Sequence, residues 1–258
     1  ALSVLSESVE LFPWNWSAWL DLTELCIEND SIMPEDIEMP SVAPWMYQFF
    51  LARTFIELGA QHQCEDAHQI LNFLRYSFPN SSYVLGEIAL ADYNLRKFEV
   101  AQAEFEELRR QDPYRLENLD IYSNILYVQE SKAALSHLAH VAMKNDKYRP
   151  ETCCIVGNYY SLKAQHAKAV LYFQRALKLN RKFLAAWTLM GHEYVEMKNT
   201  GAAIEAYRQA VDINARDYRA WYGLGQTYEL LNMFYYALYY YRKAVTLRPT
   251  DARMWCAR

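Results

Sequence analysis

The stretch Trp221-Tyr-Gly-Leu-Gly-Gln-Thr-Tyr228 decides the fold, because its landmarks recur at one fixed distance along the chain. Gly157, Gly191 and Gly225 are evenly spaced, and the tyrosine three residues after each glycine keeps the same spacing. Self-similarity at a period of this length is typical of an array of short helical units. Each unit of such an array buries its apolar face on its neighbours instead of in one central core.

The repeating pattern is Trp-x2-Leu-Gly-x2-Tyr, then Ala-x3-Phe, then Pro, which is typical of the tetratricopeptide repeat. Residues 218–251 match every landmark, with a tyrosine where phenylalanine is usual. The matching residues are Trp221, Leu224, Gly225, Tyr228, Ala237, Tyr241, Ala244 and Pro249. We therefore predict an all-α protein, a right-handed superhelical solenoid of antiparallel helix pairs.

Extending this register treats residues 1–258 as a single solenoid. The predicted complete repeats are 48–81, 82–115, 116–149, 150–183, 184–217 and 218–251. Residues 1–15 are predicted to end a truncated repeat, 16–47 to form a degenerate repeat, and 252–258 to begin a further one. Within the degenerate repeat three prolines make 28–44 irregular, which favours a variable connector over a docking feature. Because the chain begins and ends inside repeats, we expect it to be part of a longer protein.

Composition narrows the class of protein. A net charge of −5 with no basic stripe argues against nucleic acid as a partner. The five cysteines include no Cys-x2-Cys pair, so we expect neither a disulfide framework nor a zinc site, and a reducing intracellular compartment fits best. No apolar run of membrane-spanning length and no signal peptide is visible, so no membrane association is expected.

Each candidate catalytic or metal-binding motif in the sequence lacks a required residue. His192-Glu193 resembles the start of a zinc-protease His-Glu-x2-His helix, but the fifth residue is Glu196. His137 and His140 lie one helical turn apart without a third ligand, and we interpret them as solvated. We predict no catalytic residue, no metal and no cofactor. The tyrosines between 235 and 241 are interpreted mainly as packing residues.

In this class of repeat, positions 2, 5, 9 and 12 of the first helix face a concave groove. An amide and a carboxylate there suit a guanidinium, which offers a planar fork of donors. We therefore predict an arginine-bearing peptide as ligand, although on spacing alone an ordinary solvated groove remains open. The predicted peptide-binding residues are Cys154, Asn158, Ser161, Thr188, His192, Glu193, Arg219, Tyr222 and Gln226.

Several segments carry a closer resemblance, and the first two of those named next are not repeat landmarks. Asp146-Lys-Tyr-Arg149 and Glu151-Thr-Cys-Cys154 resemble the family of subunit 8 of the anaphase-promoting complex, as does Gly191-His-Glu-Tyr194. The resemblance is dense over 105–255 and collinear over 1–104.

That resemblance implies a non-catalytic scaffold subunit of an E3 ubiquitin ligase that acts in mitosis, in the nucleus and cytoplasm. The implied partners are the other subunits, a second copy in the full-length protein, and WD-repeat coactivators. The coactivators would bind through an arginine-containing motif, the C-box, and by position in the family pattern Asn158 and Glu193 belong to its pocket.

Two other functions stay open. One is a general peptide-binding adaptor or co-chaperone, which is disfavoured because Cys154 and Leu189 stand where a carboxylate clamp needs lysine and asparagine. The other is the targeting arm of an enzyme whose catalytic domain lies outside residues 1–258.

Overall fold

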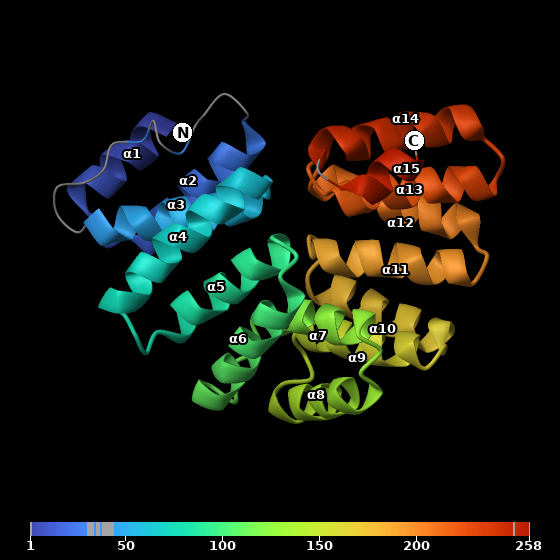
Figure 1. The fold of residues 1–258 in the computed structure, drawn as a ribbon, viewed down its shortest axis with the longest axis horizontal. Helices are drawn as coiled ribbons and strands as arrows, with labels where there is room; N and C mark the ends of the chain where they lie inside the picture. The colour runs from blue at the N-terminus through green and yellow to red at the C-terminus, as the bar shows by residue number, and fades with distance from the viewer. Residues whose placement is uncertain (1, 30–33, 35–36, 38–43, 250, 258) are drawn as a thin grey trace. The chain divides into compact units, whose positions relative to one another are not determined.

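The computed structural model describes residues 2–29, 34, 37, 44–249 and 251–257, and most of the segment predicted to be irregular lies outside these. The described part is helical and contains no strand. Its helices are α1 (Leu2–Leu11), α2 (Trp16–Glu28), α3 (Pro44–Leu58), α4 (Gln61–Ser77), α5 (Ser82–Asn94), α6 (Phe98–Gln111), α7 (Leu119–Val128), α8 (Lys132–Asn145), α9 (Pro150–Leu162), α10 (His166–Leu179), α11 (Leu184–Glu196), α12 (Thr200–Ile213), α13 (Tyr218–Leu230), α14 (Phe234–Leu247) and α15 (Ala252–Ala257) (Figure 1).

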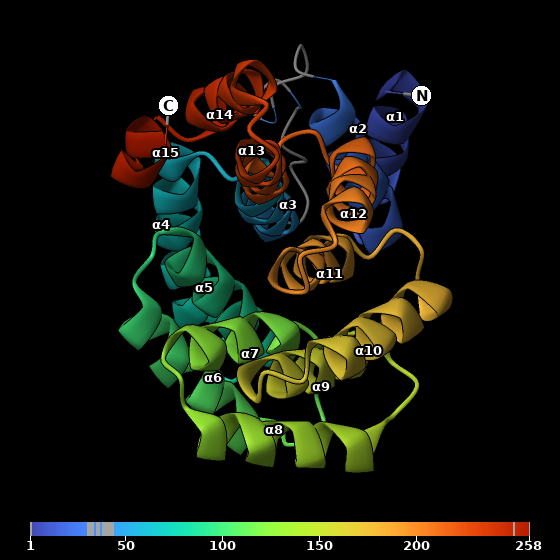
Figure 2. The same ribbon diagram turned by 90° about the vertical axis from the view of Figure 1, so that its right-hand side faces the viewer.

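Contacts divide the chain into two compact units, residues 1–113 and residues 114–258, which we call the first and the second unit. In the second unit consecutive helices pack as antiparallel pairs, α9 with α10, α11 with α12 and α13 with α14 (Figure 2). In the first unit α3 packs with α4 and α5 with α6. The predicted all-α arrangement of helix pairs is confirmed within each unit.

Close contact between the two helices of a pair explains the periodic glycines. A Cβ atom added to Gly157 would lie 2.4 Å from the ring of Phe173, and one added to Gly225 would lie 2.5 Å from Tyr241. The ring sixteen residues later in the chain therefore occupies the space that any larger side chain would need. The glycine and the aromatic residue repeat together because they are two halves of one contact.

The tryptophans of the repeat have an equally specific role. The indole N–H of Trp187 donates to the carbonyl of Arg181 at 3.0 Å, and that of Trp221 donates to the carbonyl of Ala215 at 2.7 Å. In the first unit, Trp19 donates in the same way to the carbonyl of Pro13, at 2.9 Å. Each indole thus ties the first helix of a pair to the connection before it, while its ring packs among apolar side chains.

Left-handed residues end the first helix of five pairs. Arg96, Glu130, Ala164, Lys198 and Asn232 have φ between 54° and 62° and recur at the spacing of the repeat. At each, the next amide reaches back to close the helix end, as when the Gln165 N–H donates to the Tyr160 carbonyl at 2.9 Å. None of these residues is glycine, so the sequence gives no warning of the turn.

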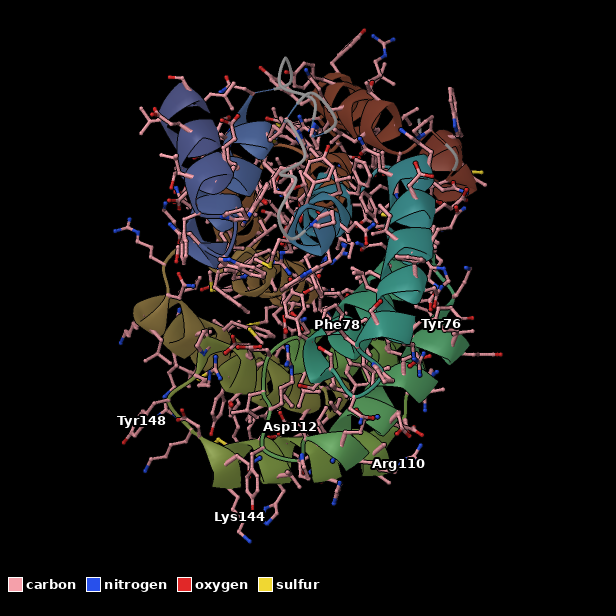
Figure 3. All side chains as sticks on the ribbon, turned by 90° about the vertical axis from the view of Figure 1, so that its left-hand side faces the viewer. Tyr76, Phe78, Arg110, Asp112, Lys144 and Tyr148 are labelled. Carbon is pink, nitrogen blue, oxygen red and sulfur yellow. The ribbon has the colours of Figure 1, made fainter. Side chains whose placement is uncertain are left out.

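The pair α3–α4 departs from this register. Its left-handed residue is Gly59, with φ 72°, three residues before the place that the period indicates. Helix α3 begins at Pro44, which the sequence analysis assigned to the irregular segment, because proline is well suited to the first position of a helix. Phe78 and Asp112, both labelled in Figure 3, are the C-terminal caps of α4 and α6.

Candidate functional site

A row of polar side chains crosses three helices of the second unit. Helices α7 and α11 both contact α9, and polar residues of α7, α9 and α11 are hydrogen-bonded to one another across these contacts. Most of these side chains are buried, and buried polar groups are retained only where their hydrogen bonds are made. The row contains Asn158, Ser161 and Glu193, three of the residues predicted to bind a peptide.

Asn158 lies at the centre of the row on α9 and is 2% exposed. Its Nδ2 donates to Ser123 Oγ and to Asn124 Oδ1, each at 2.8 Å. Because an amide nitrogen has two hydrogens, both donors are used by α7. The Oδ1 atom accepts no hydrogen bond from the described residues. Helix α7 therefore orients the amide so that its remaining capacity is that of an acceptor.

Glu193 on α11 is 5% exposed, and both of its oxygens have partners. Oε1 accepts from Ser161 Oγ at 2.6 Å, and Oε2 lies 2.8 Å from His166 Nδ1 at the start of α10. Ser161 Oγ also lies 3.3 Å from the hydroxyl of Tyr127 on α7. The carboxylate is thus held in place by α9 and α10, and each oxygen keeps lone pairs for a further donor.

The His192 side chain is exposed to solvent, although its imidazole also packs against the Tyr207 ring, with centroids 5.5 Å apart. Desolvation by the protein atoms around the ring lowers the pKa of His192 to about 4, helped by Arg219 and opposed by Asp217. The Tyr207 hydroxyl lies 2.8 Å from His192 Nδ1, and burial raises the pKa of Tyr207, so the phenol keeps its proton. The neutral imidazole then accepts at Nδ1 and carries its hydrogen on Nε2, where it can serve as a donor.

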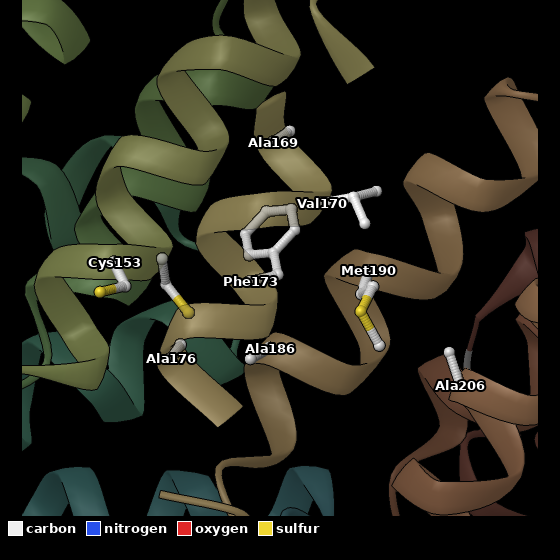
Figure 4. Close-up of a cluster of buried hydrophobic side chains, with 9 residues drawn as sticks. Cys153, Ala169, Val170, Phe173, Ala176, Ala186, Met190 and Ala206 are labelled. Atoms are coloured by element: carbon white, nitrogen blue, oxygen red, sulfur yellow. The ribbon is translucent and has the colours of Figure 1, made fainter. Parts of the chain in front are cut away.

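Two of the predicted residues are taken up by packing. Cys154 is fully buried in the apolar cluster around Phe173 and Met190, and burial raises the pKa of its thiol. Figure 4 shows Phe173 and Met190 within this cluster. Thr188 is 5% exposed, and its hydroxyl lies 3.3 Å from both the Leu184 carbonyl and Asp217 Oδ2. Position 5 of the first helix therefore faces the neighbouring helices in these two pairs and not the groove.

The three predicted residues of α13 form a separate group. Arg219 and Tyr222 are half-buried and Gln226 is exposed. Arg219 lies with its guanidinium carbon 5.8 Å from the Tyr218 ring, and the Tyr222 ring lies 5.5 Å from that of Tyr241. No hydrogen bond among the described residues joins this group to Asn158 or Glu193.

Sequence reasoning missed the residues that hold the row together. Ser123, Asn124 and Tyr127 belong to the degenerate repeat 116–149, and His166 begins a second helix, a place that was not considered for the groove. Asp120 on α7 was missed too. It is 7% exposed, and burial together with the charge of Glu151 raises its pKa to about 6. The sequence did carry a signal for three of them, because Asp120, Asn124 and Tyr127 stand at positions 5, 9 and 12 of the first helix of that repeat, which are positions expected to face the groove.

The described residues offer no group of three or more His, Cys, Asp or Glu side chains that could hold a metal ion. Within the same residues, no helix combines the length and the apolar character needed to cross a membrane.

Comparison with known proteins matches two kinds of family. Residues 1–89 match the family described as anaphase promoting complex subunit 8 / Cdc23. Residues 150–183, 191–232 and 218–251 match tetratricopeptide-repeat families.

Individual relatives agree with the first of these families. The chain is 56% identical over 189 residues to anaphase-promoting complex subunit 8 of Dictyostelium discoideum and 53% identical over 189 residues to that of Arabidopsis thaliana. Each alignment covers 73% of this chain and 31% of the relative. Identity to anaphase-promoting complex subunit CDC23 of Saccharomyces cerevisiae is 42% over 206 residues, covering 73% of this chain and 32% of the relative. The chain spans about a third of the length of the curated relatives it matches.

Proposed function

Because this chain is a tetratricopeptide-repeat protein that resembles subunit 8 of the anaphase-promoting complex, we propose that it acts as a non-catalytic scaffold subunit of that complex. Its partners are then the other subunits and, in the full-length protein, a second copy, in the nucleus and cytoplasm. The relatives carry the name of a subunit of an assembly, which supports a role in holding other proteins. The chain's helix pairs suit this role, since repeat arrays present extended surfaces.

Within that role, the row around Asn158 and Glu193 binds an arginine side chain of a coactivator segment, the C-box of WD-repeat coactivators. The observation that carries this is the orientation of Asn158, whose two donor hydrogens are both used by Ser123 and Asn124. An acceptor oxygen on α9 and a carboxylate on α11 then remain for one ligand. The Ser161–Glu193 hydrogen bond connects the same two helices.

A guanidinium fits this pair better than other ligand groups. It has five donors and no acceptor, and its planar fork suits a carboxylate and an amide oxygen together. Glu193 is 5% exposed, so a cation paired with it would be largely desolvated, where charge-assisted hydrogen bonds are strong. Neutral His192 beside the site adds no competing positive charge. A lysine would supply the charge without the fork.

The test uses Glu193→Gln, which removes the charge and keeps the size of the side chain. We expect arginine-peptide binding to weaken by about 2–5 kcal/mol, the range for truncating one partner of a buried charge pair. Glu196→Gln makes the same chemical change at an exposed position of the same helix and should bind as the unaltered protein does. Fluorescence anisotropy with a labelled coactivator peptide gives the dissociation constants.

A second arm changes the ligand. Replacing the peptide's arginine by citrulline keeps its shape and removes its charge, so binding to the unaltered protein should fall as far as it does with Glu193→Gln. Combining both changes should cost little more than either alone. Affinity within twofold of the starting pair after either single change would refute the arginine site. An intact site on a chain that does not co-purify with the other subunits would instead refute the scaffold role.

A further inference from the structure

A hollow of about 450 Å³ opens between α10, α11 and α12 of the second unit. It is separate from the row around Asn158, and none of the residues proposed to bind arginine lines it. Side chains of α11 spaced three and four residues apart form its floor, and small side chains of α12 form one wall. The residues that shape it are Leu177, Trp187, Met190, Tyr194, Ala202 and Ala206.

The neighbouring pairs of the same unit fill the equivalent place with a ring. Ala206 stands one repeat after Tyr172 and one repeat before Tyr240. Tyr172 stacks on Tyr160, with ring centroids 5.4 Å apart, and Tyr240 stacks on Tyr228 at 5.2 Å. Only the middle pair has alanine at this position.

The other alanine of the α12 wall also stands where both flanking pairs have a side chain that contacts a tyrosine ring. Ala202 corresponds to Lys168, whose ammonium lies 5.5 Å from the Tyr160 ring, and to Tyr236, which stacks on Tyr228 at 5.5 Å. Tyr194, the counterpart of Tyr160 and Tyr228, has no aromatic or cationic partner on its ring face among the described residues. Its hydroxyl lies 3.3 Å from Gln174 Nε2, a contact at the rim of the ring and not on its face. Of the three tyrosines, only Tyr194 therefore lacks a stacked or cationic partner among the described residues.

We propose that this hollow binds a tyrosine side chain of a partner protein, stacked on Tyr194 in the place that Tyr172 and Tyr240 occupy in the flanking pairs. The flanking pairs define the chemistry of the occupant, because they hold a tyrosine ring against the same backbone framework. Offset-stacked rings at 4.5–7 Å are mutually favourable beyond the area they bury. An uncovered aromatic floor with apolar walls is typical of a recognition pocket.

Charged side chains at the rim of the hollow indicate which type of residue should stand next to the partner's tyrosine. Lys178 and Arg181 line the α10 side of the hollow, both are exposed, and neither forms an ion pair within the described residues. Glu205 lies on the α12 side. The partner segment should therefore carry an acidic residue next to its tyrosine, placed so that the acid faces the two cations on α10's side of the rim. Such rim charges act mainly on orientation and choice of partner.

The experiment titrates the whole chain with three blocked dipeptides, acetyl-Asp-Tyr-amide, acetyl-Lys-Tyr-amide and acetyl-Asp-Ala-amide. Met190 lies in the floor, so its ¹³C-labelled methyl group reports occupancy by NMR, with Met190→Leu used to assign the signal. We expect a saturable shift with the Asp-Tyr peptide, binding several-fold weaker with Lys-Tyr, and no saturable shift with Asp-Ala. Losing the stacked ring should weaken binding by about tenfold, which puts saturation by Asp-Ala beyond the concentrations that saturate Asp-Tyr.

Ala206→Tyr fills the hollow from within and should abolish the shift. The variant is expected to fold, because both flanking pairs carry tyrosine there. Gly201→Ala is the matched control on α12, since an added Cβ meets nothing within 4 Å, and it should bind as the unaltered protein does. An unchanged Met190 shift in Ala206→Tyr, or equal binding of all three peptides, overturns the proposal. Glu193→Gln should leave this shift intact, which separates its outcome from that of the arginine site.

Discussion

The two units build helix pairs of the same kind around different contacts. In the second unit, Gly157, Gly191 and Gly225 each receive a ring from the facing helix. The same period reaches Ala89 and Phe55 in the first unit, where no glycine stands. There the core gathers around Trp19 and Phe50 with many neighbouring aromatic rings. A helix pair thus needs complementary volumes at its contact, and a small residue facing a ring is only one way to supply them.

The largest effect should come from the aromatic core of the first unit. Trp19 is fully buried, and its indole also holds the Pro13 carbonyl. We expect Trp19→Ala to lower the free energy of unfolding by about 3–5 kcal/mol. Leu20→Ala, at an exposed position of the same helix, should change it little. Urea unfolding followed by circular dichroism measures both, and a similar loss in the two variants would contradict a core centred on Trp19.

In the second unit, the corresponding destabilising substitution is Gly191→Ala. Its Cβ would lie 2.5 Å from the Tyr207 ring, and a Cβ added at Gly223 would also lie 2.5 Å from that ring, so α13 lies against it as well. Because the ring cannot retreat, overpacking should destabilise the unit by about 1–3 kcal/mol. Gly201→Ala, with open space around the added Cβ, should be neutral or stabilising by up to about 1 kcal/mol. Equal stability of the two variants in urea would show that the glycine period is not a packing requirement.

Buried acids also distinguish the units. In the first unit, Glu87 is 2% exposed and accepts from Arg53 Nη1 at 2.9 Å. In the second unit, no ion pair reaches Asp120 from the described residues, and its pKa is raised to about 6 from 3.8. The folded chain therefore binds this proton more tightly than the unfolded chain does. Asp120 then makes stability fall as pH rises from about 4 to 6, and the loss persists at pH 7.

Asp120→Asn should remove this loss and raise the free energy of unfolding at pH 7 by about 3 kcal/mol. Below pH 4 the variant should match the unaltered protein. His192 has the opposite slope, because its lowered pKa makes stability rise with pH between about 4 and 6.5. The quantity to measure is therefore the difference in the free energy of unfolding between Asp120→Asn and the unaltered protein, determined by urea unfolding at each pH. A difference that does not change with pH would exclude the raised pKa as its cause.

The smallest effects concern the turns. Gly59 in the first unit and Ala164 in the second both have positive φ. Gly59→Ala should destabilise its unit and Ala164→Gly should stabilise the other, each by about 1 kcal/mol, since the left-handed region is unfavourable for any residue with a Cβ. Thermal unfolding gives both values, and changes of the same sign would contradict the backbone assignment.

Sequence reasoning predicted the helix pairs and the close contacts at the glycines. It also singled out Asn158 and Glu193, which the structure places in one hydrogen-bonded row. It did not reach the burial of Cys154, because position 5 of that helix lies against neighbours whose sizes differ from pair to pair. It also favoured packing for Tyr235, which is 92% exposed, whereas Tyr236 and Tyr239 make ring contacts and are still more than half exposed. Those positions lie on the outer face of α14, and the period of the landmarks does not distinguish an outer face from a seam.

The sequence by itself determined the repeat, since a contact that recurs at every helix pair must recur in the residues that make it. Only the tertiary structure decided what lies between the landmarks. Ser123 and Asn124 turn the Asn158 amide, and Ser161 and His166 hold Glu193. Two alanines leave a hollow that tyrosines fill in the flanking pairs. These features depend on several side chains from different helices at once, and such combinations leave no periodic trace in one chain.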